Sequence, residues 1–214
     1  MSLLDAKAVI FDMDGVLVDT MELHRVSWEK LAKKLGKPFS NELFMQGNGL
    51  PGIAHAFLYR WTTSHDEAIS YVEQKEAIFL ETTLIEGIRP MPGVNDFLEV
   101  LSARNIPCAV GTSAPRDNMH STLKAAGLDS FFKAFVSVED VTKGKPDPEV
   151  FLRAAEKLGM APEDCVVIED AFLGVEAAKA GGIYTIAITH THTREELKHA
   201  DLIVGSFAEL VKLL

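Results

Sequence analysis

Cysteines and long hydrophobic runs are scarce in this sequence, and acidic residues outnumber basic ones. The 214 residues include two cysteines, Cys108 and Cys165, and both lie in short apolar runs typical of strands. This placement favours reduced thiols in a hydrophobic core over a disulfide framework. No apolar run approaches the ~20 residues that a membrane-spanning helix needs, and the N-terminus lacks a signal-peptide pattern. We therefore expect a cytoplasmic protein with no membrane partner.

The charge balance is acidic, with 21 Lys and Arg against 31 Asp and Glu and a formal net charge of −10. Such a surface disfavours general binding to nucleic acid, whose phosphates carry the same sign. An acidic protein that handles an anionic substrate must neutralise it locally, with a metal ion or a few placed Lys and Arg side chains. The composition, 47% hydrophobic and 24% charged, is ordinary for a globular protein of one or two domains. The oligomeric state stays open.

The first third of the chain is helical in pattern. From Asp19 to Leu84, apolar residues recur at helical spacing and strand-like runs are missing. Asp19, with Glu22 three residues later, is expected to cap the first of these helices. The stretch therefore resembles a small helical domain inserted after one strand.

The remainder of the chain alternates short apolar runs with helical segments. The first apolar run is Ala8–Phe11, and the third is expected at 135–138. Regular alternation predicts a parallel sheet with right-handed crossovers. We predict an α/β fold with a Rossmann-like parallel sheet in three α/β/α layers, formed by residues 1–16 and 87–214. Residues 17–86 would form an inserted α-helical cap domain.

The residues Asp12-Met13-Asp14-Gly15-Val16 follow the first strand directly. The carboxyl ends of parallel strands are where open α/β sheets hold their ligands. Two carboxylates there repel one another unless a cation or a shared proton relieves them. Gly15 allows a tight turn beside them. The alternative is an ordinary polar loop, because Asp and Gly are common turn residues.

Three other strand ends carry residues suited to the same chemistry. Thr112-Ser113 follows the second predicted strand, Lys145 lies in the loop beyond the third, and Glu169-Asp170 ends the fourth. Hydroxyls, a lysine and four carboxylates at one rim form a coherent set for phosphoryl transfer, which needs positioning, a divalent metal and charge neutralisation. Taken singly, Lys145 could be a solvated loop lysine and Thr112-Ser113 could cap the next helix.

Together these four segments resemble the motifs of the haloacid dehalogenase-like superfamily of hydrolases, and the flanking residues are similar to its β-phosphoglucomutase-like branch. The resemblance implies that Asp12 is a nucleophile that forms an aspartyl-phosphate. Asp14 would protonate the leaving oxygen and later activate water. Thr112 would donate a hydrogen bond to the phosphoryl oxygens, and Lys145 would neutralise them. An aspartate at position 14 favours phosphate chemistry over dehalogenation, since a halide leaving group needs no acid.

The same resemblance implies a Mg²⁺ site. The Asp12 side chain, the Asp14 backbone carbonyl and the Asp170 carboxylate would bind the ion, with Glu169 acting through water. Hard oxygen ligands completed by water and substrate suit Mg²⁺. Glu169 and Asp170 at a buried strand end also need a compensating charge.

Six further residues are candidates for contacts with substrate: Ser113, Arg116, His24, Gln46, Gly47 and Asn48. In the mutase branch a histidine at the place of His24 helps to align the acid/base aspartate. The alternatives are a structural histidine on a helix face and a surface arginine at position 116. The glycine-rich segment from Gly47 to Gly52 is the expected specificity loop, although it could equally be a plain turn.

The residues of the cap loop help to distinguish a phosphatase from a phosphosugar mutase. β-Phosphoglucomutase holds a second phosphate with a lysine before the cap-loop glycine and an arginine shortly after it, whereas Gln46-Gly47-Asn48-Gly49-Leu50-Pro51 contains neither. We therefore expect a Mg²⁺-dependent phosphatase of a small phosphorylated metabolite, a sugar phosphate or similar. The alternative is a phosphosugar mutase in which Arg60, Lys75 or Arg116 supplies the cation. A catalytically silent binding module is least favoured, because every motif residue is present.

Overall fold

The protein divides into two compact units. A computed structural model describes residues 3–47, 50 and 52–214. Unit 1 comprises Met1–Asp19 and Arg89–Leu214, and unit 2 comprises Thr20–Ile88. These boundaries lie two or three residues beyond those predicted. The reason is that the two segments connecting the units, near Leu17–Asp19 and Arg89–Met91, are hydrogen-bonded to one another within unit 1. The Met91 N–H donates to the Leu17 carbonyl oxygen, and the Asp19 N–H donates to that of Arg89, each at 2.9 Å.

Unit 1 is built on a parallel sheet, as predicted. Its strands lie in the order β3-β2-β1-β4-β5-β6. They are β1 (Ala8–Phe11), β2 (Cys108–Gly111), β3 (Phe132–Val136), β4 (Cys165–Glu169), β5 (Tyr184–Ile188) and β6 (Leu202–Val204). The helices of unit 1 are α5 (Val94–Ala103), α6 (Arg116–Ala125), α7 (Glu149–Leu158), α8 (Phe172–Ala180) and α9 (Phe207–Leu213). Four 3₁₀ turns are described, at Leu3–Asp5, Asp129–Phe131, Val138–Asp140 and Pro162–Asp164.

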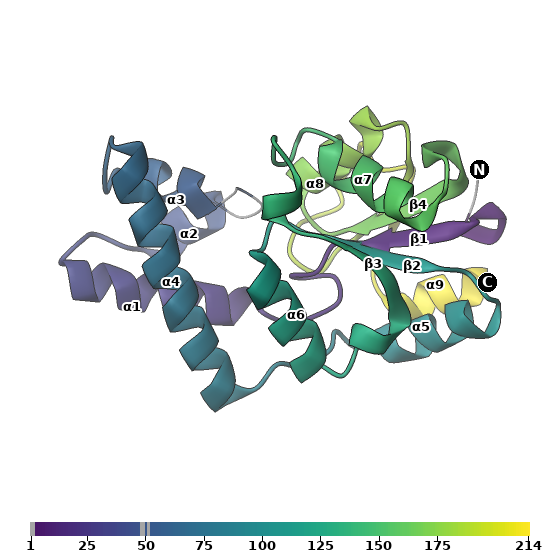
Figure 1. Ribbon diagram of the computed structural model, residues 1–214, viewed down its shortest axis with the longest axis horizontal. Helices are drawn as coiled ribbons and strands as arrows, with labels where there is room; N and C mark the ends of the chain where they lie inside the picture. Colours follow the sequence, from purple (N-terminus) through teal and green to yellow (C-terminus); the bar gives the residue numbers. More distant parts are fainter. Residues whose placement is uncertain (1–2, 48–49, 51) are drawn as a thin grey trace. The chain divides into compact units, whose positions relative to one another are not determined.

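The central strand β1 shows why the fold has three layers. Ala8 and Ile10 belong to a buried cluster with side chains of α7 and α8. The alternate residue Phe11 faces the other way, and its ring lies 6.1 Å from that of Phe97 on α5. Phe97 in turn packs against Phe207 on α9, with ring centroids 5.5 Å apart. Figure 1 shows α7 and α8 on one side of these strands and α5 and α9 on the other. This is the predicted Rossmann-like α/β/α arrangement.

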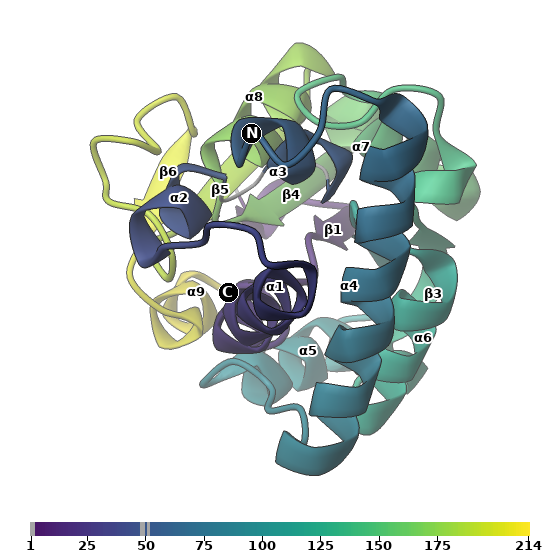
Figure 2. The same cartoon turned by 90° about the vertical axis from the view of Figure 1, so that its left-hand side faces the viewer.

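Unit 2 is helical and has its own core. Its helices are α1 (Met21–Leu35), α2 (Asn41–Gln46), α3 (Gly52–Leu58) and α4 (His65–Glu86). Figure 2 shows α1 end-on beside the long helix α4, and the two are in contact. The core of unit 2 is largely aromatic and contains Trp28, Leu31, Ala32, Phe44, Tyr59 and Trp61. Among the described residues, none of the helices combines the length and apolar character needed to cross a membrane.

Two local predictions are wrong. The first helix is capped by Thr20 rather than Asp19, and the Thr20 side chain makes no capping hydrogen bond. Asp19 lies one residue too early because its backbone pairs with Arg89 in unit 1. The strand expected at 135–138 is β3, which begins at Phe132 and ends at Val136. It ends there because Ser137 and Asp140 form a capping box around a 3₁₀ turn, which takes up the backbone groups that a longer strand would use.

Replacing Leu31 by Ala tests whether this side chain belongs to the core that stabilises unit 2. Leu31 is fully buried, so we expect a loss of about 2–5 kcal/mol in the free energy of unfolding of that unit. Both tryptophans of the chain, Trp28 and Trp61, lie in the same cluster, so tryptophan fluorescence during urea unfolding reports this core.

The matched control is Leu84→Ala on α4, where the side chain is 87% exposed. This change should alter the unfolding free energy by no more than about 0.5 kcal/mol. Equal effects of the two substitutions would contradict the assignment of the core.

Candidate active site

Three adjacent strands of unit 1 end at the same level and present the predicted motif residues there. In the sheet register Phe11 of β1 pairs with Val110 of β2 and with Ile168 of β4. Asp12 follows β1, Thr112 follows β2, and Asp170 follows β4. The sheet therefore gathers residues that are more than 150 positions apart in sequence, such as Asp12 and Asp170. Lys145 reaches this edge from the loop that precedes α7.

Lys145 lies at the centre of the cluster. Its ammonium nitrogen Nζ donates to Asp12 Oδ1 and to Glu169 Oε1, each at 2.7 Å. The residue is 6% exposed, and Nζ lies 4.8 Å from the centroid of the Phe151 ring on α7. The alternative of a solvated loop lysine is therefore wrong. A buried ammonium bridging two carboxylates is placed to neutralise whatever negative charge enters at Asp12.

The Glu169 carboxylate is held by donors of the protein itself. Oε1 accepts from Lys145, while Oε2 accepts from the backbone N–H groups of Asp170 and Ala171, each at 2.6 Å. Gly174 on α8 makes room for this carboxylate, because a Cβ added there would overlap Oε1. Glu169 is thus committed to anchoring Lys145. This contact favours an indirect role at a metal site over direct coordination.

Burial and mutual repulsion shift the acidic groups of the cluster. Burial raises the pKa of Asp12 to about 7, an effect opposed by Lys145 and reinforced by Glu169. Burial also raises the pKa of Asp170 well above its usual value, with Glu169 and Asp12 adding to the rise. Burial lowers the pKa of Lys145, but Asp12 and Glu169 together raise it above its ordinary value. Once ionised, these acids would carry more negative charge than the single ammonium balances.

This imbalance matches a divalent cation. Ligand oxygens of Asp12, Glu169 and Asp170 all lie within 4.8 Å of one another. When all three carboxylates are ionised, they exceed the single ammonium by two negative charges (three minus one). The donors are hard oxygens, the type that Mg²⁺ prefers. The cluster can therefore hold a magnesium ion.

The turn after β1 brings Asp14 to the same edge. Asp14 is partly exposed, and the next residue, Gly15, has a φ of 80°. A Cβ at position 15 would overlap Asp170 Oδ2, so both the left-handed backbone and the close approach require glycine. The turn is closed by a hydrogen bond from the Gly15 N–H to the Val18 carbonyl oxygen at 2.9 Å.

Thr112 is buried at the end of β2. Its hydroxyl accepts from the Ala114 N–H at 3.1 Å, and its own N–H donates to the Val136 carbonyl oxygen at 3.0 Å. The alternative that Thr112-Ser113 caps the next helix is wrong, since α6 begins at Arg116 with Pro115 at the cap position. Ser113 is half-buried beside Thr112.

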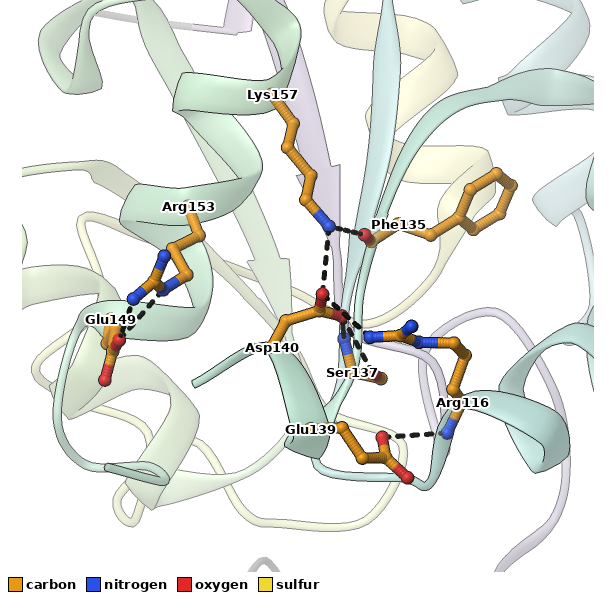
Figure 3. A network of polar contacts seen from close by, with 8 residues as sticks. All are labelled: Arg116, Phe135, Ser137, Glu139, Asp140, Glu149, Arg153 and Lys157. Atoms are coloured by element: carbon orange, nitrogen blue, oxygen red, sulfur yellow. Dashed lines mark hydrogen bonds and ion pairs between the residues drawn. The ribbon is translucent and has the colours of Figure 1, made fainter. Parts of the chain in front are cut away.

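Arg116 belongs to a network of polar contacts (Figure 3). Its guanidinium donates to Asp140 at 3.0 Å, and its backbone N–H donates to Glu139 at 3.0 Å. Asp140 also accepts from the Ser137 N–H and from Lys157 on α7. The Ser137 N–H, followed by Lys157, holds the pKa of Asp140 below its usual range. The network joins the loop after β2 to the end of β3, so Arg116 has a structural role whether or not it contacts substrate.

A second carboxylate in Figure 3 holds the loop that carries Lys145. Glu149 Oε2 accepts from the N–H and hydroxyl of Thr142 at 2.8 Å and from the Lys143 N–H at 3.0 Å. Its other oxygen pairs with Arg153 at 2.6 Å. The Thr142 hydroxyl and Arg153 lower the pKa of Glu149 to about 2. The loop is therefore fixed at its outer end by Glu149 and at its inner end by Lys145.

The remaining predicted residues belong to unit 2. His24 on α1 stacks on Phe79 at 4.2 Å, and its Nδ1 lies 2.6 Å from Nζ of the buried Lys75. Gln46 is exposed at the end of α2. Gly47 is buried, and a Cβ there would lie 2.6 Å from the His55 ring. Asn48 lies outside the described residues. The contacts of these residues with substrate stay predictions.

Sequence reasoning missed the segment after β5. The residues His190, Thr191 and His192 contact the Gly15 carbonyl oxygen and Asp170. The available signal was the polar run Thr189–Thr193 directly after a predicted strand, at the edge of the sheet where the other motifs lie. Histidine and threonine are common in loops, so the run alone carried little weight.

Replacing Gly174 by Ala tests the packing around Glu169. Within a helix, alanine is favoured over glycine by about 1 kcal/mol, so a purely local effect would stabilise the protein. We expect instead a loss of about 1–3 kcal/mol, because the Glu169 carboxylate must leave its buried donors. Urea unfolding followed by far-ultraviolet circular dichroism measures the change, and a stabilised variant would contradict the interpretation.

Comparison with known proteins bears on the chemistry of this site. The chain is 35% identical over 186 residues to the phosphorylated carbohydrates phosphatase of Thermotoga maritima, covering 84% of this chain and 83% of the relative. It is 33% identical over 205 residues to hexitol phosphatase A of Escherichia coli, covering 95% of this chain and 93% of the relative.

Its structure is similar to that of β-phosphoglucomutase from Clostridium difficile, with a TM-score of 0.84 and 25% identity over 96% of this chain and 93% of that one. A family model of haloacid dehalogenase-like hydrolases matches residues 6–182. The chain therefore belongs to the haloacid dehalogenase-like hydrolases, in their β-phosphoglucomutase-like branch.

Proposed function

We propose that the protein is a Mg²⁺-dependent phosphatase that hydrolyses a small phosphorylated sugar or polyol through an aspartyl-phosphate on Asp12. The observation that carries the proposal is the buried cluster in which Lys145 bridges Asp12 and Glu169 beside Asp170. The relatives named as a phosphorylated carbohydrates phosphatase and a hexitol phosphatase support the substrate class.

In the first step an Asp12 carboxylate oxygen attacks phosphorus and the bond from phosphorus to the sugar oxygen breaks. The leaving oxygen takes a proton from Asp14, and the partial exposure of this residue supports that role. Lys145 is already bonded to Asp12 Oδ1, so its charge lies where the phosphoryl oxygens arrive. The Thr112 hydroxyl oxygen accepts from the Ala114 N–H, and its proton would be donated to one of the phosphoryl oxygens.

In the second step water attacks phosphorus, and the bond between phosphorus and Asp12 breaks. The Asp14 carboxylate formed in the first step accepts the proton from water, so the enzyme returns to its starting state. The products are the free alcohol and inorganic phosphate. Each step is a displacement at phosphorus assisted mainly by fixed charges, as phosphoryl transfer requires.

The Asp12 side chain, the Asp14 backbone carbonyl and the Asp170 carboxylate would hold the magnesium ion, with Glu169 acting through water. When bound, the ion would neutralise the phosphoryl oxygens and the excess charge of the cluster. Glu169 itself keeps Lys145 in place.

A phosphosugar mutase is the second candidate, because the fold is close to that of a β-phosphoglucomutase. A mutase needs a cation in the cap for a second phosphate. Gln46 and Gly47 offer none, whereas Lys75 is a buried lysine within unit 2 that contacts His24 and Glu76. We favour the phosphatase, since a neutral cap loop binds a dianion poorly.

The deciding assay supplies Mg²⁺ and a panel of hexose, pentose and hexitol phosphates. One arm contains β-glucose 1-phosphate with a trace of glucose 1,6-bisphosphate, and free phosphate and glucose 6-phosphate are followed together. We expect phosphate release from at least one compound and its loss with a chelator. Primer-dependent glucose 6-phosphate without phosphate release would instead identify a mutase.

Asp12→Asn should lower turnover at least about a thousandfold under either reaction, because it removes the attacking carboxylate. The matched control is Asp129→Asn, the same change at an exposed position of unit 1, which should leave turnover unchanged. A variant with Asn at position 12 that retained activity would eliminate the proposed nucleophile.

Magnesium binding should weaken as the pH falls. Because burial raises the pKa of Asp12 to about 7, its carboxylate holds a proton below that pH in the metal-free protein. The cation must displace this proton, so we expect the dissociation constant to rise by up to about tenfold per pH unit below about 7. Calorimetric titration in buffers of different ionisation enthalpy measures both affinity and proton release. A dissociation constant that stays level between about pH 6 and 8 would contradict the raised pKa.

A further inference from the structure

The segment that follows β5 lies against two parts of the proposed metal site. The Nδ1 atom of His190 lies 2.9 Å from the Gly15 carbonyl oxygen, in the turn that contains Asp14. Two residues later, His192 Nδ1 lies 3.0 Å from the Asp170 backbone oxygen. Between them, Thr191 contacts the Asp170 side chain itself. A segment of three residues therefore joins the turn after β1 to the end of β4.

Thr191 makes the contact that bears most directly on metal binding. Its hydroxyl donates to Asp170 Oδ2 and lies 3.1 Å from the Asp170 backbone oxygen. Gly15 also packs closely here, because a Cβ at that position would overlap Oδ2 and lie 3.1 Å from Thr191 Cγ2. Asp170 Oδ2 is thus enclosed by Thr191 and Gly15, which leaves the other carboxylate oxygen to face a cation.

The three buried acids differ in how their charge is supported. Asp12 and Glu169 share the ammonium of Lys145, and Glu169 also accepts two backbone N–H groups. Asp170 is 3% exposed and is repelled by both neighbours. The Thr191 hydroxyl favours its charged form, opposing burial and this repulsion. A carboxylate that rotated away from Thr191 would lose this support.

We propose that Thr191 is a positioning residue that orients the Asp170 carboxylate for magnesium. This inference rests on the proposed magnesium-dependent function and deepens it. The hydroxyl holds Oδ2 and fixes the rotation of the carboxylate, so the carboxylate is already oriented when the cation binds. Partners that orient metal ligands in this way typically change metal affinity by about 10–100-fold when they are removed.

The test is direct metal binding by the full-length, metal-free protein, with Mn²⁺ as the probe and the electron paramagnetic resonance signal of free Mn²⁺ as the readout. Thr191→Val keeps the shape of the side chain and removes the hydroxyl, so its dissociation constant should rise at least about tenfold. Thr191→Ser restores the hydroxyl and should bind within about threefold of the wild-type value. In kinetic assays of the valine variant, the Mg²⁺ concentration for half-activation should rise more than turnover at saturating Mg²⁺ falls.

The matched control is Thr189→Val, because the Thr189 hydroxyl contacts the Val204 carbonyl oxygen and not Asp170. This variant should bind Mn²⁺ as the wild type does. Circular dichroism and thermal unfolding of the metal-free variants confirm that each is folded. Should the valine variant fail to fold, Thr191→Ala also lacks the hydroxyl and carries the same expectation.

Wild-type affinity in a folded variant without the hydroxyl would overturn the proposal. So would an equal loss in the serine variant, because the methyl group rather than the hydroxyl would then be responsible. A wild-type protein that binds no Mn²⁺ overturns it as well. Tight Mn²⁺ binding that depends on the hydroxyl, without phosphate release from any substrate, would uphold this inference and overturn the phosphatase.

Discussion

The buried ammonium of Lys145, shared between Asp12 and Glu169, is the interaction on which the site of unit 1 depends. Removing three such charges from water costs several kcal/mol for each ion. At an effective dielectric constant of about 20, the attraction within each close pair contributes about 4 kcal/mol. Both ion pairs are therefore needed to offset the cost of burying the three charges. Both bonds are 2.7 Å long. The parallel pairing of β1 with β4 places the two carboxylates at one level, and the loop before α7 brings the ammonium between them.

The surrounding groups show how an excess of acid is tolerated. The Glu169 carboxylate accepts from two backbone N–H groups and lies in the space left by Gly174. The Asp170 carboxylate accepts from the Thr191 hydroxyl and lies in the space left by Gly15. In both places a glycine provides room and a donor supports the charge. Burial raises the pKa of Asp12 and Asp170, and the repulsion between the neighbouring acids adds to the rise. A divalent cation would relieve this repulsion, so the same packing that strains the metal-free cluster favours metal binding.

The two units differ in the interactions that shape them. Unit 1 positions charged groups at the ends of buried strands. Unit 2 packs around aromatic rings and contains a buried lysine beside His24. The choice among substrates is a property of particular sites rather than of the fold.

The sequence alone determined the class of fold and predicted which residues lie together at the ends of the strands. Short apolar runs that end in Asp12, Thr112 and Glu169-Asp170 predict parallel strands whose carboxyl ends meet, because this edge is a property of the topology and not of detailed packing. The sequence could not predict that Glu169 anchors Lys145, since that contact needs β4 beside β1 and a glycine on α8. Nor could it predict the ends of β3 or the cap at Thr20, where hydrogen bonds accepted by the Asp140 side chain and the Arg89 carbonyl oxygen outweighed local propensity. Thr191 was hidden for the same reason: its importance comes from the Asp170 carboxylate that the tertiary structure places against it.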